Sequence, residues 1–141
     1  MKLTVFLDSN IFIFAFERES SNSSKIIQLL TENVFTCIVS EKVVEEIAAY
    51  FKKYYSSELS WKFKKFVFDT CRVVPRSQVV GSVEKLKGVV HKGDIEHVAT
   101  ARALGLRYIV SYDSDYEAIA EYITPKKFVQ MLGFKEAKAE Y

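Results

Sequence analysis

The sequence predicts an α/β fold, a three-layer α/β/α arrangement around a mostly parallel central sheet of about five strands. Short apolar runs without polar alternation recur along the chain, as expected for strands buried on both faces of a parallel sheet. Segments with helical spacing of apolar residues separate these runs. The alternation favours helices on both faces of the sheet, joined to it by right-handed crossovers.

Five short segments are expected to form the strands of this sheet. They cover residues 3–7, 35–39, 72–74, 107–110 and, as the weakest of the five, 121–123. Most of them are continuous apolar runs, which indicates burial on both faces.

Helices are expected in the segments between these strands. The expected ranges are 22–32, a helix that starts after Ser40, 59–70, about 78–87, a helix opened by residues 93 and 94, and 125–132. Ser40 is a suitable N-cap, and Thr124 followed by Pro125 reads as an N-cap with proline in the first turn. Gly105 is a suitable residue to end the helix that begins near Asp94.

The composition fits one soluble globular domain over residues 1–141, with 49% hydrophobic and 27% charged residues. Runs of about 18 apolar residues are absent from the sequence, so no membrane span is expected. The first apolar stretch meets Asp8 too early for a signal peptide, which makes the cytoplasm the expected location. Cys37 and Cys71 are expected to be reduced core residues.

Several classes of function are excluded by missing motifs. The net charge of +2 is too small to indicate a nucleic-acid binder by itself. The sequence contains no glycine-rich phosphate loop and no Gly-x-Ser-x-Gly motif. His91 and His97 lack further ligands at zinc-site spacing, and His97 is expected on an exposed or half-buried helix side.

Of four acidic residues, two follow an expected strand, one opens a helix, and one lies one to two turns past Ser40 in the helix that Ser40 caps. They are Asp8 and Asp113, Asp94, and Glu46, from four separate segments of the chain. In an open α/β sheet, ligands bind beyond the carboxyl ends of the strands, where three of these acids are expected. The competing interpretation for each aspartate is a helix N-cap or a first-turn acid.

Carboxylates gathered without cysteine or histidine ligands suit hard cations such as Mg²⁺ or Mn²⁺. Such ions can generate a hydroxide nucleophile and stabilise the attacking and leaving oxygens of a phosphodiester. Metal-assisted phosphodiester cleavage is therefore the chemistry that these residue types favour.

The segments around the acids resemble the PIN-domain nuclease family, which includes the VapC-type toxins of toxin–antitoxin pairs. The likeness runs from residue 3 to about residue 132, and it rests on the order and spacing of five short motifs. The motifs are Leu7-Asp8-Ser9-Asn10-Ile11, Ser40-x-x-Val43-x-x-Glu46, Asp94-x-x-x-Val98-Ala99-x-Ala101, Ile109-Val110-Ser111-x-Asp113-x-Asp115-Tyr116 and Thr124-Pro125-x-x-Phe128.

The resemblance implies a metal-dependent endoribonuclease that uses Mg²⁺ or Mn²⁺. Asp8, Asp94 and Asp113 would hold a first ion, directly or through water. Glu46, together with Asp94, would hold a second ion or orient the attacking water. The register of the motifs selects Glu46 over its neighbour Glu45.

Three further residues would support these ligands according to the resemblance. Asn10 and Ser111 would orient the carboxylates, the kind of support that metal sites need. Asp115 is an auxiliary acid and the alternative to Asp113 as the fourth ligand. Glu96 is a second candidate auxiliary, and for both auxiliaries the competing interpretation is an exposed acid at a helix start.

RNA is the implied substrate, and several roles remain open. The protein is either a toxin held inactive by an antitoxin protein or a housekeeping RNA-processing nuclease, and the length favours the toxin. A non-catalytic RNA-binding or scaffolding module is an alternative, as is a phosphatase with Asp8 as nucleophile.

Aromatic residues are dense between positions 50 and 68, and Trp61 and Phe68 lie off the expected buried face. These exposed rings suggest a homodimer or antitoxin interface, and no membrane contact is expected.

Overall fold

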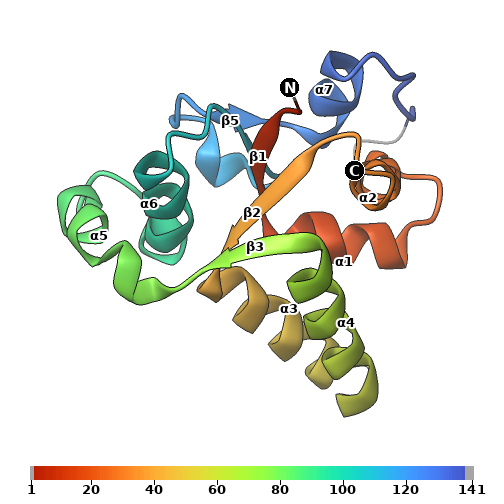
Figure 1. Ribbon diagram of the computed structural model, residues 1–141, viewed down its shortest axis with the longest axis horizontal. Coiled ribbons are helices and arrows are strands. Elements are labelled where there is room, and N and C mark those ends of the chain that lie inside the picture. Colours follow the sequence, from red (N-terminus) through yellow and green to blue (C-terminus); the bar gives the residue numbers. More distant parts are fainter. Residues whose placement is uncertain (1, 139–141) are drawn as a thin grey trace.

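A five-stranded parallel sheet forms the centre of the computed structural model, which describes residues 2–138 (Figure 1). The strand order is β3-β2-β1-β4-β5, and every neighbouring pair is parallel. The strands are β1 (Thr4–Leu7), β2 (Thr36–Ser40), β3 (Cys71–Val74), β4 (Ile109–Val110) and β5 (Tyr122–Ile123). All five lie within or beside the expected segments, so the predicted fold class is confirmed.

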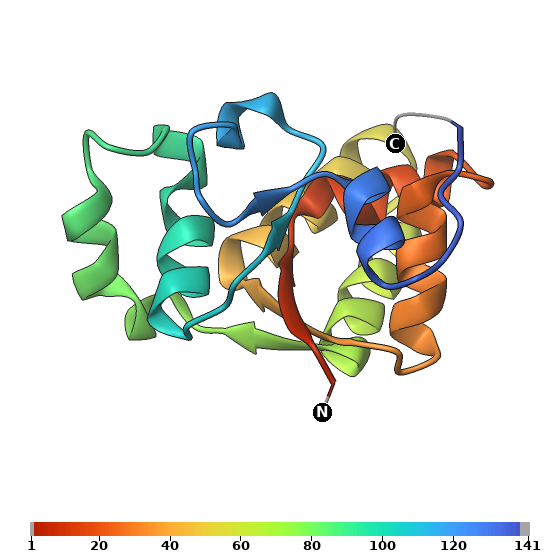
Figure 2. The same cartoon turned by 90° about the horizontal axis from the view of Figure 1, so that it is seen from above.

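Helices cover both faces of this sheet, as expected. They are α1 (Ser9–Glu17), α2 (Asn22–Thr31), α3 (Glu41–Tyr54), α4 (Ser57–Thr70), α5 (Val80–Leu86), α6 (Ile95–Ala103) and α7 (Pro125–Met131). In Figure 2, α5 and α6 lie on one side of the sheet, whereas α1, α2 and α7 lie on the other. None of the described helices is long and apolar enough to cross a membrane.

The central strands β1, β2 and β4 are buried on both faces, which explains their apolar runs without alternation, whereas the edge strands β3 and β5 are partly exposed. Three of the four β1 residues, Val5, Phe6 and Leu7, are completely buried. Cys37 and Cys71 pair in register across β2 and β3, and both thiols are free.

Helix α1 is not apparent from the apolar pattern of the sequence. Its side chains are apolar nearly all round, and Ile11 and Phe12 are buried while Phe16 is 43% exposed. The helix packs against both α2 and α3, so it has contacts on more than one side. A helix with apolar residues all round lacks the amphipathic period that would reveal it.

The order of the strands places a crevice at the end of β1. The chain moves outward from β1 to β2 and β3, and then returns to the other side of β1 as β4. Such a reversal is the topological switch point at which open α/β sheets bind ligands. Asp8 directly follows β1 and Ser111 directly follows β4, so both lie at this point.

Helix α6 is followed by a glycine in the left-handed conformation, as the sequence indicates. Gly105 has a φ of +67°, and the amide of the next residue, Leu106, donates to Ala101 O at 2.8 Å. Gly81, inside α5, does not have a positive φ, and a Cβ there would have no atom within 4 Å.

Alanine at these two glycines is expected to change stability in opposite directions. Gly105→Ala should lower the free energy of unfolding by about 1 kcal/mol, because a side chain disfavours the left-handed region. Gly81→Ala should raise it by roughly 0.4–1 kcal/mol, because it reduces the entropy of the unfolded chain. Urea unfolding of both variants measures these values, and shifts of the same sign would contradict this account.

Candidate functional site

Asp8 is a buried carboxylate at the end of the central strand. It is 5% exposed and caps α1, where its Oδ1 accepts from the Ser9 amide at 2.7 Å. Its Oδ2 accepts from Ser111 Oγ at 2.8 Å and from Asn10 Nδ2 at 3.3 Å. Burial raises the pKa of Asp8 despite these donors and despite the opposing influence of His97. Asp8 therefore caps α1, as the competing interpretation expected, and its second oxygen also contacts Ser111 and Asn10.

Asn10 and Ser111 connect Asp8 to the segment that follows β4. Asn10 Nδ2 donates to Ser111 Oγ at 3.2 Å, and Asn10 Oδ1 accepts from the Tyr112 amide at 3.2 Å. Ser111 Oγ also accepts from the Asp113 amide at 3.0 Å. Both side chains hydrogen-bond the Asp8 carboxylate that the resemblance expects them to orient.

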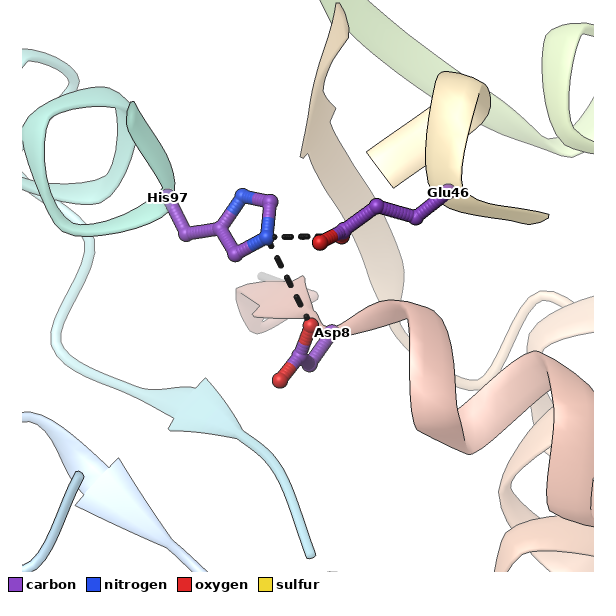
Figure 3. A group of neighbouring side chains, drawn as sticks. All are labelled: Asp8, Glu46 and His97. Atoms are coloured by element: carbon purple, nitrogen blue, oxygen red, sulfur yellow. Dashed lines mark hydrogen bonds and ion pairs between the residues drawn. The ribbon is translucent and has the colours of Figure 1, made fainter. Parts of the chain in front are cut away.

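Glu46 meets Asp8 through a histidine that the sequence interpretation did not assign to the site. His97 Nε2 lies 2.9 Å from Glu46 Oε1 and 3.7 Å from Asp8 Oδ1 (Figure 3). On its other side, His97 Nδ1 lies 2.8 Å from Ser40 Oγ. Ser40 Oγ already accepts from the Val43 amide at 3.2 Å, so its own proton can go to Nδ1. With a neutral ring, this arrangement leaves the proton on Nε2, where it is donated to Glu46.

The two partners of this hydrogen bond shift each other's pKa in the direction of an ion pair. Burial raises the pKa of Glu46, but the hydrogen bond and charge of His97 outweigh it, and the net direction is downward. Burial lowers the pKa of His97, but Glu46 and Asp8 outweigh it, and the net direction is upward. Glu46 is thereby kept ionised inside the pocket.

The expectation that His97 lies on an exposed or half-buried helix side is wrong. Its side chain is 1% exposed, and its ring packs 5.4 Å from the ring of Phe6, measured between centroids. Helix α6 packs on β1 and β2 and so carries His97 against the sheet. The sequence did indicate that His97 faces the site, because residues three apart share a helix face and His97 follows Asp94 at that spacing.

Asp94 and Asp113 complete the acidic pocket, which we define as Asp8, Glu46, Asp94 and Asp113. Asp94 ends the 3₁₀ turn η2 (Lys92–Asp94), and Asp113 caps the 3₁₀ turn η3 (Ser114–Tyr116). Burial and the nearby charges of Asp8 and Asp113 raise the pKa of Asp94. The four acids named by the sequence therefore gather at the carboxyl edge of the sheet.

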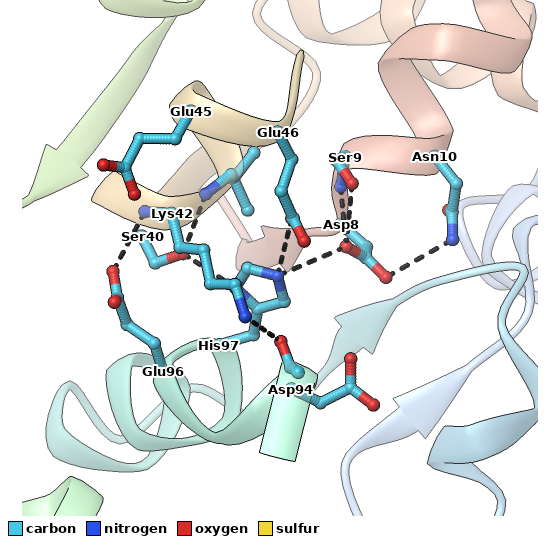
Figure 4. A network of polar contacts seen from close by, with 12 residues as sticks. Asp8, Ser9, Asn10, Ser40, Lys42, Glu45, Glu46, Asp94, Glu96 and His97 are labelled. Atoms are coloured by element: carbon cyan, nitrogen blue, oxygen red, sulfur yellow. Dashed lines mark hydrogen bonds and ion pairs between the residues drawn. The ribbon is translucent and has the colours of Figure 1, made fainter. Parts of the chain in front are cut away.

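The neighbouring acids take different places around the pocket. Glu45 is exposed and pairs with Arg76, so Glu46, and not Glu45, faces Asp8 (Figure 4). Glu96 is only 8% exposed, which contradicts its interpretation as an exposed helix-start acid. It accepts from the Lys42 amide at 2.9 Å and from Arg76 Nε at 2.5 Å, and so ties α6 to the start of α3. The Asp115 amide donates to Asp113 Oδ1 at 2.9 Å.

The donor set of the pocket fits a divalent cation. One ligand atom from each of Asp8, Glu46 and His97 lies within 4.8 Å of the others. Carboxylate oxygens are the ligands preferred by Mg²⁺ and Mn²⁺, and a dication would offset the burial and the neighbouring negative charges that raise the pKa of Asp8 and Asp94. The Tyr116 side chain is buried beside these acids, and burial together with the charges of Asp8 and Asp94 raises the pKa of its hydroxyl.

Comparisons with known proteins agree with this architecture. A family model described as the PIN domain matches residues 4–115. A toxin–antitoxin complex from Klebsiella pneumoniae is similar, with a TM-score of 0.65 and 22% identity over 86% of this chain and 97% of that one. VapBC2 from Rickettsia felis, bound to a promoter DNA fragment, has a TM-score of 0.67 and 15% identity over the same shares.

A third similar structure is the VapC20 toxin of Mycobacterium tuberculosis, described as cleaving the sarcin–ricin loop. It has a TM-score of 0.61 and 12% identity, over 81% of this chain and 93% of that one. At identities this low, the TM-scores show a shared fold and nothing further. No curated protein matches the chain in sequence.

Replacing His97 is expected to raise the pKa of Glu46 in the metal-free protein. His97→Leu removes both the hydrogen bond and the charge that lower this pKa, whereas His97→Gln can still donate and should raise it less. Carbon-detected NMR titration of the glutamate carboxyl groups measures the change. His91→Gln is the matched control and should leave the pKa of Glu46 unchanged. An unchanged or lowered Glu46 pKa in His97→Leu would refute the conclusion that the hydrogen bond from His97 keeps Glu46 ionised.

Proposed function

Because the chain belongs to the PIN domain family, we propose that it is a Mg²⁺- or Mn²⁺-dependent endoribonuclease that cleaves RNA phosphodiester bonds. The observation that carries the proposal is the acidic pocket, where Asp8 and Glu46 meet at the buried His97 and the charges of Asp8 and Asp113 act on Asp94. A non-catalytic scaffolding role would not require this crowding of charge. A phosphatase with Asp8 as nucleophile fits poorly, because hydrogen bonds from Ser9 and Ser111 hold both Asp8 oxygens.

Each residue of the pocket has a distinct role in this proposal. A bound divalent cation would supply activation of the attacking water and neutralisation of charge on the phosphate. Asp8, Asp94 and Asp113 would hold that cation, and Asn10 and Ser111 keep Asp8 in position. Asp115 supports Asp113 through the hydrogen bond from its amide.

Glu46 is the base of the proposed reaction. Its carboxylate stays ionised because His97 donates to it, so it can accept the proton of the attacking water. Ser40 holds the histidine ring in the orientation that this hydrogen bond needs. The chain of Ser40, His97 and Glu46 therefore acts as one positioned unit.

We further propose that the nuclease is a cytoplasmic toxin inhibited by an antitoxin protein. The similar structures include several toxin–antitoxin complexes. An apolar groove of about 290 Å³ lies between α1, α2 and α4, and an antitoxin segment with apolar side chains would fill it. Its lining residues are Phe12, Ala15, Phe16, Ser24, Ile27, Lys62, Phe63 and Phe66. A housekeeping nuclease would have no evident need for this groove.

The aromatic residues of α3 and α4 divide between the core and the surface. Phe51 and Phe63 stack with centroids 4.0 Å apart, so part of the set fills the space between the helices. Trp61 and Phe68 are 61% and 57% exposed. We propose these two rings as the contact with a second copy of the chain in a homodimer.

RNA cleavage by the purified protein is expected only with Mg²⁺ or Mn²⁺, and EDTA should stop it. Asp8→Asn should lower the rate by orders of magnitude, because it removes a carboxylate ligand while keeping the shape. Cleavage of a labelled RNA, with this variant as control for contaminating nuclease, measures both effects. Equal activity of wild type and Asp8→Asn, or full activity in EDTA, would disprove the proposal.

The metal-free stability of Asp8→Asn shows whether Asp8 is a ligand or only a helix cap. Because the pKa of Asp8 is raised, the folded state binds more protons, and wild-type stability should fall as pH rises above the unfolded value of about 3.9. At neutral pH the variant should be no less stable, and it should gain about 1 kcal/mol for each unit of pKa shift removed. Earlier unfolding of the variant in urea would assign Asp8 a structural role alone.

The antitoxin proposal is tested by expression in a bacterial host. The wild-type chain should arrest growth, and the product of the neighbouring short reading frame should relieve the arrest. Phe16→Lys, in the groove, should stay toxic but lose this relief, because a charge disfavours an apolar contact. Phe134→Lys, at an exposed phenylalanine outside the groove, is the matched control and should keep this relief. Relief of Phe16→Lys would exclude the groove as the antitoxin site.

A further inference from the structure

The two cysteines of the chain lie side by side on neighbouring strands of the sheet. Cys37 on β2 and Cys71 on β3 are directly paired in the parallel register, and both are free thiols. Side chains at paired positions of neighbouring strands point to the same face of a sheet. The sequence holds only these two cysteines, so a disulfide within the chain could form only between them.

The backbone spacing at this pair suits a disulfide bond. Neighbouring strands of a sheet lie about 4.8 Å apart, and a disulfide joins α-carbons that are about 4.4–6.8 Å apart. The thiols of Cys37 and Cys71 are also close enough to hydrogen-bond each other. The two sulfur atoms are therefore neighbours in the reduced protein, and a bond between them needs no rearrangement of the sheet.

The two thiols differ in their access to solvent. Strand β3 is the edge strand beside β2, and Cys71 is its first residue (Figure 1). The side chain of Cys71 is only partly buried, whereas Cys37 is 3% exposed. A small oxidant from solution therefore reaches Cys71 first, and Cys37 is held next to it inside the sheet.

The two thiols also differ in acidity. The hydrogen bond from Cys37 lowers the pKa of Cys71 against the opposing effect of burial. Burial, together with the neighbouring thiol of Cys71, raises the pKa of Cys37. The thiolate is the form of cysteine that reacts with oxidants, so access and acidity both select Cys71 as the residue that is oxidised first.

We propose that Cys37 and Cys71 are an oxidation site, at which a hydroperoxide converts the two thiols into a reversible disulfide bond. The proposal goes beyond the nuclease function and does not rest on it. Disulfides in the cytoplasm are usually transient and respond to oxidants, so free thiols are the expected resting state of the pair. A disulfide with a partly exposed sulfur is among those that are readily reduced again.

The oxidation balances over the two thiols and one molecule of hydrogen peroxide. The Cys71 sulfur attacks one peroxide oxygen and the O–O bond breaks, which gives a sulfenic acid on Cys71 and, with the proton of its thiol, one water. The Cys37 sulfur then attacks the Cys71 sulfur, the S–O bond breaks, and a second water leaves with the Cys37 proton. The two sulfurs together lose two electrons, which reduce the peroxide.

The bond would close a loop of the chain that contains both α3 and α4, since these helices lie between positions 37 and 71. A crosslink over a loop of this kind stabilises the folded protein mainly by restricting the unfolded chain. It would also tie the edge strand β3 to the centre of the sheet, at the start of the segment that leads to Arg76. Oxidation is therefore expected to stabilise the protein.

Treatment of the reduced, purified full-length chain with hydrogen peroxide tests the proposal. Thiol counting in denaturant should show that both thiols are lost, and the intact mass should fall by that of two hydrogen atoms. Peptide mapping should find Cys37 and Cys71 joined in one crosslinked species, and dithiothreitol should restore both thiols. The oxidised wild type should melt several degrees above the reduced wild type in scanning calorimetry, because the crosslink restricts the unfolded chain.

Cys37→Ser is the matched control, because it keeps Cys71 and removes the thiol that would complete the disulfide. In this variant, peroxide should leave Cys71 as a sulfenic or sulfinic acid, with a gain of oxygen mass and no bond within the chain. The proposal is overturned if the wild type also only gains oxygen, if it is crosslinked only between chains, or if both thiols stay free. Melting of the oxidised wild type at or below that of the reduced form would overturn the stabilising effect.

Discussion

The burial of the Asp8 carboxylate at the end of the central strand is the constraint on which the site depends. A buried charge is costly unless it is hydrogen-bonded, and Asp8 takes its donors from three places. Ser9 and Asn10 begin α1, whereas Ser111 follows β4. Satisfying this one group therefore fixes α1 at the end of β1 and fixes the end of β4 beside it.

The same constraint governs the opposite wall of the pocket. His97 reaches Asp8 from α6 and Glu46 from α3, and it is itself held by Ser40 at the end of β2. Each member of this set is held by a group from a different element, so no single loop determines the geometry.

The sequence was sufficient to predict the sheet and the four acids, because both depend on local pattern. Parallel strands show apolar runs, and residues after strand ends must share one edge of the sheet. Helix α1 could not be seen, since apolar residues surround it and the period is lost. The spacing from Asp94 indicates the face of α6 on which His97 lies, but the burial of His97 and Glu96 depends on how α6 packs on β1, β2 and α3. Tyr116 was visible only as part of a motif, and its burial beside Asp94 is a property of the folded chain.

Arg76 connects the two helices that carry Glu46 and His97, through ion pairs that lie outside the pocket and depend on salt concentration. Its guanidinium joins Glu41 and Glu45 of α3 to Glu96 of α6, on the two helices that carry Glu46 and His97. The Arg76 side chain is 46% exposed, so dissolved ions screen its ion pairs, whereas the contacts of the buried His97 with Glu46 and Asp8 are shielded from those ions. Rising ionic strength should therefore loosen the spacing between the two helices before it disturbs any bond inside the pocket. The separation between the carboxylates of the acidic pocket therefore depends in part on the ion pairs of Arg76, which salt weakens.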